Sequence, residues 1–109
     1  MLPGQMVDCI RTCNGCHDIC TEAVQHCLKI GGEHAAPAHI RLMLDCAEIC
    51  QTSADFMLRS SDYHGRVCGV CAEVCEACAQ DCARFPDDAM MRQCAEMCRL
   101  CADSCREMA

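Results

Sequence analysis

Cysteine recurs at alternating intervals of three and four residues in four separate segments of the chain. Residues 68–82, CGVCAEVCEACAQDC, place five thiols in this rhythm. Such spacing keeps side chains on one face of an α-helix, whereas the period of two in a β-strand would divide them between two faces. The pattern therefore predicts helices that each carry one stripe of thiols. The sixteen cysteines are Cys9, Cys13, Cys16, Cys20, Cys27, Cys46, Cys50, Cys68, Cys71, Cys75, Cys78, Cys82, Cys94, Cys98, Cys101 and Cys105.

Turn-forming residues separate the four segments. Gly31 and Gly32 suit the end of one helix, and Pro37 suits the first turn of the next. Ser61 or Asp62 is the expected N-cap of the third helix, and carboxylates near residues 87–88 suit the start of the fourth. The expected helices, 5–30, 37–60, 64–84 and 87–107, are similar in length and closely connected. They predict an all-α fold, an antiparallel up-down-up-down four-helix bundle with a cysteine-lined core, in one domain over residues 1–109.

The thiol stripes have two explanations besides metal binding. Cysteine packs as a small hydrophobic residue, but leucine would fill a bundle core better and would not oxidise. Disulfides within a helix are disfavoured, because side chains at i and i+4 lie side by side and do not point at each other. Neither explanation accounts for sixteen cysteines in 109 residues on one register.

The cellular setting also favours metal over disulfides. The first eight residues have no cationic start and no apolar run of signal-peptide length, and no stretch approaches membrane-spanning length. We therefore expect a cytoplasmic protein without membrane contacts, in which thiols stay reduced. The net charge of -7, with only nine scattered Lys and Arg residues, argues against a nucleic-acid partner.

The spacing favours Cu(I) among the metals. The Cβ atoms of i and i+4 residues lie about 5 to 6 Å apart, so two sulfurs can close to about twice a metal–sulfur bond of about 2.3 Å. Cu(I) accepts two or three soft thiolate or thioether ligands, whereas Zn(II) requires a tetrahedron. The candidate pairs are Cys9/Cys13, Cys16/Cys20, Cys46/Cys50, Cys71/Cys75, Cys78/Cys82, Cys94/Cys98 and Cys101/Cys105.

Charge balance predicts many ions. If each thiolate bridges two Cu(I) ions and each ion holds two thiolates, the ratio is one ion per cysteine and no net charge is buried, which gives roughly 16 ions. The empty core would hold neutral thiols with raised pKa and release protons on loading. Apolar residues should keep the empty bundle folded: Ile10, Ile19, Val24, Ile40, Leu42, Leu44, Ile49, Val67, Val70, Val74, Met97 and Leu100.

His39 and Met43 continue the stripe of residues 37–60, seven and three positions before Cys46. In an antiparallel bundle they would lie at the same end as Cys27 and Cys82. Neutral ligands there would hold copper less firmly than thiolates, so we expect His39 and Met43 to bind copper at an entrance. For five further residues both roles, core filling and metal binding, stay open: Met6, Met57, Met91, His26 and His34.

These motifs resemble the cytosolic bacterial copper storage protein family of cysteine-rich four-helix bundles. The resemblance covers essentially the whole chain and includes the run His39-x-x-x-Met43-x-x-Cys46-x-x-x-Cys50. It implies a bundle whose interior stores many Cu(I) ions, a homotetramer, and a role in sequestering copper against toxicity. It also implies that the sixteen cysteines are the ligands, with His39 and Met43 as candidates at the entrance.

The sequence is thus interpreted as a non-enzymatic Cu(I) store, serving detoxification or supply and loaded by a copper chaperone or a small thiol. The alternative is a zinc-binding or redox-responsive thiol protein that uses only some of the cysteine pairs. A catalytic thiol is not indicated, because no cysteine differs in its sequence surroundings from the others.

Overall fold

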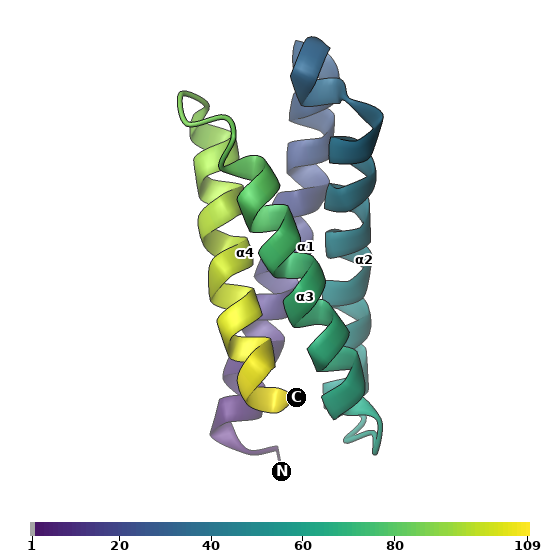
Figure 1. Cartoon of the computed structure of the whole chain (residues 1–109). Coiled ribbons are helices and arrows are strands. Elements are labelled where there is room, and N and C mark those ends of the chain that lie inside the picture. The colour runs from purple at the N-terminus through teal and green to yellow at the C-terminus, as the bar shows by residue number, and fades with distance from the viewer. Residues whose placement is uncertain (1) are drawn as a thin grey trace.

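The structure, a computed structural model, describes residues 2–109, and Met1 lies outside the described part. Four helices, α1 (Gly4–Ile30), α2 (Pro37–Leu58), α3 (His64–Cys82) and α4 (Ala89–Met108), alternate in direction along one long axis (Figure 1). A short 3-10 helix, η1 (Gly32–Ala35), connects α1 to α2. The predicted all-α, up-down-up-down bundle is confirmed. Among residues 2–109, no helix combines the length and apolar character needed to cross a membrane.

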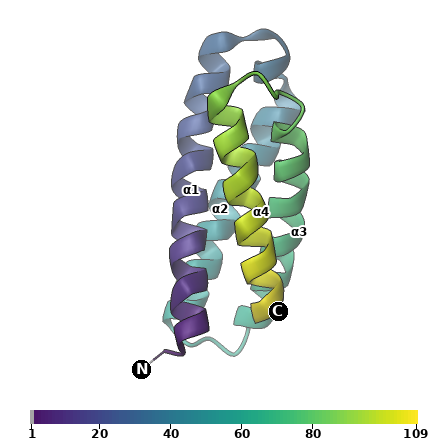
Figure 2. The same ribbon diagram turned by 90° about the vertical axis from the view of Figure 1, so that its left-hand side faces the viewer.

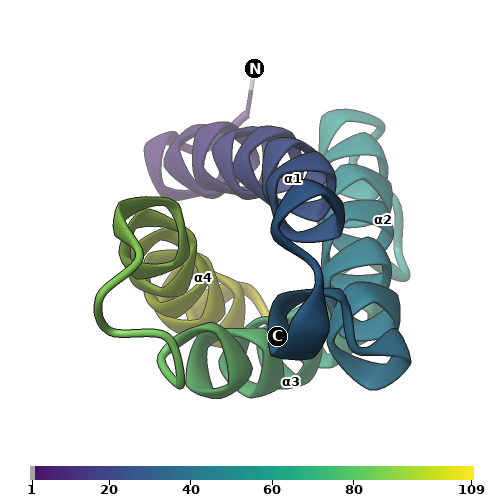
Figure 3. The same cartoon turned by 90° about the horizontal axis from the view of Figure 1, so that it is seen from above.

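The helices form a ring in the order α1, α2, α3, α4, so that α4 closes against α1 (Figures 2 and 3). Each helix packs on its two ring neighbours. The connections from α1 to α2 and from α3 to α4 lie at one end of the bundle, and the two termini lie near the other end (Figure 1). The stripes of all four helices therefore face one shared interior.

The helix boundaries follow the predicted turn chemistry with one exception. Gly31 and Gly32 have φ of 77° and 57°, a region that favours glycine, and Pro37 begins α2. Asp88 caps α4, because its carboxylate accepts a hydrogen bond from the backbone N–H of Met91. The predicted N-cap at Ser61 or Asp62 is wrong. Helix α3 begins after Tyr63, and the Ser61 hydroxyl instead accepts the Tyr63 N–H within the preceding turn.

All sixteen cysteines have fully buried, free thiols. Small residues flank the thiol stripes and let the helices approach closely. These buried alanines, which the sequence analysis did not single out, are Ala23, Ala47, Ala54, Ala72, Ala79, Ala95 and Ala102. The core is therefore built of sulfur and alanine and contains little leucine.

Three of the apolar residues expected to support the bundle do not do so. Leu44, Val70 and Leu100 are at least half exposed. Each lies two residues from a cysteine of its stripe, and two residues turn a helix by about 200°, so the side chain falls on the outer face. Val67 is half-buried. The rest of that set is buried or half-buried against the core: Ile10, Ile19, Val24, Ile40, Leu42, Ile49, Val74 and Met97.

Candidate metal centre

The shortest sulfur–sulfur contacts join neighbouring helices. Cys13 Sγ of α1 lies 3.5 Å from Cys105 Sγ of α4, and Cys50 Sγ of α2 lies 3.5 Å from Cys75 Sγ of α3. A disulfide bond would bring the sulfurs to about 2.05 Å, so these are hydrogen-bonded thiols. The sequence predicted contacts between i and i+4 thiols on one helix but did not predict this cross-helix network.

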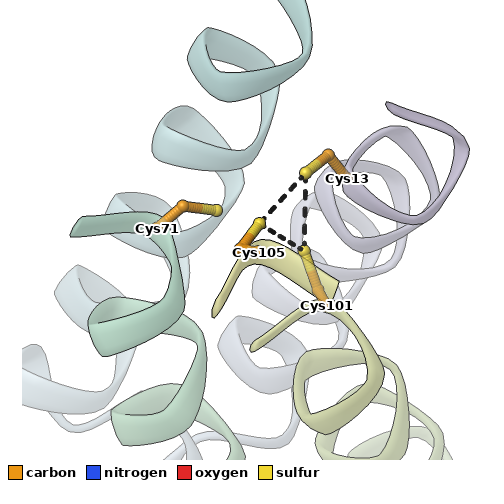
Figure 4. A group of neighbouring side chains, drawn as sticks. All are labelled: Cys13, Cys71, Cys101 and Cys105. Atoms are coloured by element: carbon orange, nitrogen blue, oxygen red, sulfur yellow. Dashed lines mark hydrogen bonds between the residues drawn. The ribbon is translucent and has the colours of Figure 1, made fainter. Parts of the chain in front are cut away.

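Five groups of four thiols have all their sulfurs within 4.8 Å of one another, and we call them tetrads. One of them, Cys13, Cys71, Cys101 and Cys105, draws on three helices (Figure 4). This spacing is about twice a metal–sulfur bond of about 2.3 Å, so one ion can bridge two thiolates of a tetrad with little rearrangement. The other tetrads are Cys50/Cys71/Cys75/Cys101, Cys16/Cys46/Cys50/Cys75, Cys16/Cys20/Cys46/Cys98 and Cys20/Cys78/Cys94/Cys98.

The tetrads contain five of the seven predicted i, i+4 pairs. These are Cys16/Cys20, Cys46/Cys50, Cys71/Cys75, Cys94/Cys98 and Cys101/Cys105. Cys9/Cys13 and Cys78/Cys82 lie at the two ends of the stack, and neither pair falls together within a tetrad. The thiol stack thus runs through most of the length of the bundle.

His39 lies at the end of the bundle that we call the mouth, with Cys27 and Met91. Its Nδ1 lies 2.5 Å from Asp81 Oδ2, and its Nε2 lies 3.5 Å from Cys27 Sγ. Because a carboxylate only accepts, Nδ1 carries the proton and Nε2 keeps a lone pair that faces the thiol. Asp81, His39 and a bound ion would form the carboxylate–histidine–metal arrangement common in metalloproteins.

Met91 and Met43 supply thioethers near the mouth. The Cys27 thiol donates to Met91 Sδ at 3.7 Å, and both methionines are fully buried. Met57 is fully buried and Met6 half-buried toward the opposite end, which we call the closed end and which also contains Cys9, Ser53 and Cys68. The Ser53 hydroxyl is fully buried and has no hydrogen-bond partner among residues 2–109.

Two carboxylates, Asp81 and Asp88, contribute to the mouth, although neither was predicted as a site residue. The Asp81 carboxylate accepts hydrogen bonds from His39 Nδ1 and, at 2.8 Å, from Arg84 Nε. Its place directly before Cys82, beside the stripe, was the available signal.

Asp88 anchors the other two histidines near the mouth. Its Oδ2 lies 2.7 Å from His26 Nε2 and 3.0 Å from His34 Nε2. Both imidazoles thus bond to this carboxylate, outside the thiol stack. Burial raises the pKa of the Asp88 carboxyl, but hydrogen bonds from His26, Met91 N–H and His34 outweigh burial and lower the pKa to about 2.

Burial keeps the Cys27 thiol at the mouth protonated in the empty protein. It raises the pKa of Cys27 to about 11, with further contributions from Asp88, Cys94 and Asp81. Deeper in the stack, hydrogen bonds to Cys16 and other thiols, together with burial, raise the pKa of Cys98. The chemistry available here is binding of a soft cation with release of thiol protons.

Comparisons with known proteins agree with this chemistry. A model of the copper storage protein family matches residues 3–109. The crystal structure of a Nitrosospira multiformis protein is 47% identical, with a TM-score of 0.91 over 96% of this chain and 94% of that one. The Cu(I)-bound copper storage protein BsCsp3 is 33% identical, with a TM-score of 0.90 over 96% of this chain and 98% of that one.

Two further relatives extend the comparison. A cytosolic copper storage protein from Streptomyces lividans, solved with five coppers, is 33% identical, with a TM-score of 0.82 over 95% of this chain and 91% of that one. The uncharacterised cysteine-rich protein YhjQ of Bacillus subtilis is 35% identical over 64 residues, a match that spans 59% of each chain.

Proposed function

Because the chain belongs to the copper storage protein family, we propose that it binds and stores many Cu(I) ions in the core of its bundle. The observation that carries the proposal is the run of five overlapping tetrads, made entirely of buried, free thiols. Relatives of this fold are solved with Cu(I) bound and loaded with 10 copper equivalents.

Charge favours Cu(I) over Zn(II) as the stored ion. A tetrahedral zinc site with four thiolates has a net charge of about −2, and burying several such charges side by side is costly. Cu(I) and bridging thiolates in equal number are neutral. A capacity on the order of the thiol count, roughly 16 ions, follows from this neutrality. All sixteen cysteines are then ligands, with His39 and Met43 as ligands at the mouth.

Each Cu(I) ion that enters must displace about one thiol proton, because the empty core is neutral. At the mouth, the Nε2 lone pair of His39 lies beside Cys27 and is positioned to bind the entering ion, while Asp81 accepts the Nδ1–H and so maintains this tautomer. We assign the first steps of copper loading to Cys27, His39 and Asp81. The rest of the proposal is a non-enzymatic cytoplasmic homotetramer of one-domain subunits, loaded by a copper chaperone or a small thiol and used for detoxification or supply.

Anaerobic titration of the reduced protein with Cu(I), against a competing chelator, tests the proposal. We expect Cu(I)–thiolate ultraviolet absorption to rise linearly to about one ion per cysteine. Saturation at two to four ions would contradict storage. Tight zinc binding at low stoichiometry, or reversible disulfides under mild oxidant, would then favour the zinc-binding or redox-responsive alternative.

A further inference from the structure

Successive tetrads overlap, and each neighbouring two share a pair of thiols from adjacent helices. From the closed end toward the mouth, the shared pairs are Cys71/Cys101, Cys50/Cys75, Cys16/Cys46 and Cys20/Cys98. These pairs join α3 to α4, α2 to α3, α1 to α2, and α4 to α1. The overlap therefore moves by one helix at each step around the ring of helices, and Figure 3 shows this ring from above.

Each tetrad follows one construction rule. One helix supplies an i, i+4 pair, and each of its two ring neighbours supplies one further thiol. From the closed end, the helix that supplies the pair is α4, then α3, α2, α1 and α4 again. The two i, i+4 pairs outside the tetrads continue the same rotation. Cys9/Cys13 of α1 lies on the closed-end side of the five tetrads, and Cys78/Cys82 of α3 lies on the mouth side. We call the five tetrads and these two end pairs the thiol ladder.

Helix α2 supplies no thiol at either end of the ladder. Toward the closed end from Cys50, the next stripe position of α2 is Ser53. At this end of the ladder, Cys9 Sγ and Cys13 Sγ lie 3.8 and 3.5 Å from Cys105 Sγ. Toward the mouth from Cys46, the next stripe position of α2 is Met43. A thioether is a soft ligand for Cu(I), whereas a neutral hydroxyl is not. On α2, the ladder thus begins with a copper ligand at the mouth and ends with the Ser53 hydroxyl, which has no hydrogen-bond partner within the described residues 2–109.

We propose that the thiol ladder is the transfer route of the core, along which Cu(I) passes through the shared thiol pairs, one helix at a time, from the Met43 end to the Ser53 end. The inference rests on the proposed storage function. The apolar side chains of Leu2, Met6 and Met108 pack against the closed end of the core, while neutral ligands gather at the mouth.

Each transfer step is a ligand exchange without oxidation or reduction. A Cu(I) ion held by two thiolates forms a bond to a third sulfur, which loses its proton. The ion then breaks its bond to one of the original thiolates, which takes up a proton, so the charge stays constant. Contacts of 3.5 to 3.8 Å along the shared pairs, as at Cys50/Cys75, Cys16/Cys46 and Cys20/Cys98, let the ion move without leaving sulfur.

Removing a shared pair tests the route. In the double variant Cys16→Ser/Cys46→Ser, six thiols remain on the mouth side and eight on the closed side. Reduced protein is mixed with Cu(I) bicinchoninate, and the decay of the chelator's colour is followed. We expect a fast phase with somewhat under half of the total amplitude and a second phase at least tenfold slower. The matched control Cys9→Ser/Cys68→Ser also loses two thiols but keeps every shared pair, so it should load at the wild-type rate.

A second interruption makes the test independent of any one variant. Cys20→Ser/Cys98→Ser leaves four thiols on the mouth side and ten on the closed side, so its fast phase should be smaller. Helicity by circular dichroism identifies the folded variants. If a folded interrupted variant fills completely at the wild-type rate, the route is overturned while storage stands. If wild-type protein saturates at a few ions, storage and the route fall together.

Discussion

Asp81 on α3 holds His39 on α2 through a 2.5 Å contact between Oδ2 and Nδ1, and this contact turns the other imidazole nitrogen toward Cys27. One carboxylate thereby sets the tautomer of a fully buried imidazole at the mouth of the thiol stack. The ion pair of Asp81 with Arg84 fixes the carboxylate in turn.

Asp81→Asn should slow the first phase of Cu(I) loading about tenfold and leave the final capacity unchanged. The neutral amide can donate to Nδ1 and so move the proton to Nε2, which then has no lone pair for the entering ion. Stopped-flow loading at several pH values measures the effect. Asp103→Asn is the matched control, because Asp103 is exposed and, in the described part of the chain, forms an ion pair with Arg106 alone. Equal loading rates for wild type and Asp81→Asn would contradict this role.

His39→Leu/Met43→Leu tests the mouth itself. Both side chains are fully buried, and leucine keeps the site apolar and filled, so the bundle should stay folded. We expect slower loading with a final copper content within about two ions of wild type, because two neutral ligands are lost while every thiolate remains. Time-resolved uptake and endpoint metal analysis measure the two quantities separately. Unchanged loading kinetics would place the entrance elsewhere.

The stability of the empty protein should fall at alkaline pH. The pKa of Cys27 is raised from 9.0 to about 11, so the folded state binds a proton that the unfolded state has released. This contribution is fully present below pH 9 and is lost as the pH rises through 11. For Cys27 it amounts to at most about 2 to 3 kcal/mol. Urea unfolding of reduced apoprotein from pH 8 to 11 should show the decline, and Cys27→Ala should reduce it.

Asp88 ties the start of α4 to the end of α1 and to η1 through Met91, His26 and His34. Asp88→Ala should lower the free energy of unfolding by about 1 to 3 kcal/mol, since it removes the helix cap and both histidine bonds. Asp88→Ser keeps a capping oxygen and should recover about 1 kcal/mol of that loss. Denaturant unfolding at pH 7 compares the three proteins, and equal stability of the two variants would show that capping contributes nothing.

The fold could be predicted because one residue type marks the inner face of every helix. The period of three and four placed all sixteen cysteines in the core, and Gly31, Gly32 and Pro37 located the first turn. The network between helices could not be predicted, because a stripe fixes which face is buried but not the height at which neighbouring helices meet. Asp81 was missed for the same reason, since its importance depends on His39 at the same height on another helix.

Ser53→Cys should extend the thiol ladder by one step. The new sulfur would stand on α2 at the closed end of the bundle, and it would replace a buried hydroxyl that has no partner among residues 2–109. We expect the Cu(I) capacity to rise by about one ion at an unchanged initial loading rate, because the addition lies at the closed end. Ser53→Ala is the matched control: it should keep the wild-type capacity and match or exceed the wild-type stability by up to about 1 kcal/mol, since an unsatisfied polar group is removed. Endpoint titration and urea unfolding measure both quantities. A Ser53→Cys protein that is folded and reduced, but binds no more copper than Ser53→Ala, would show that the ladder does not end at this residue.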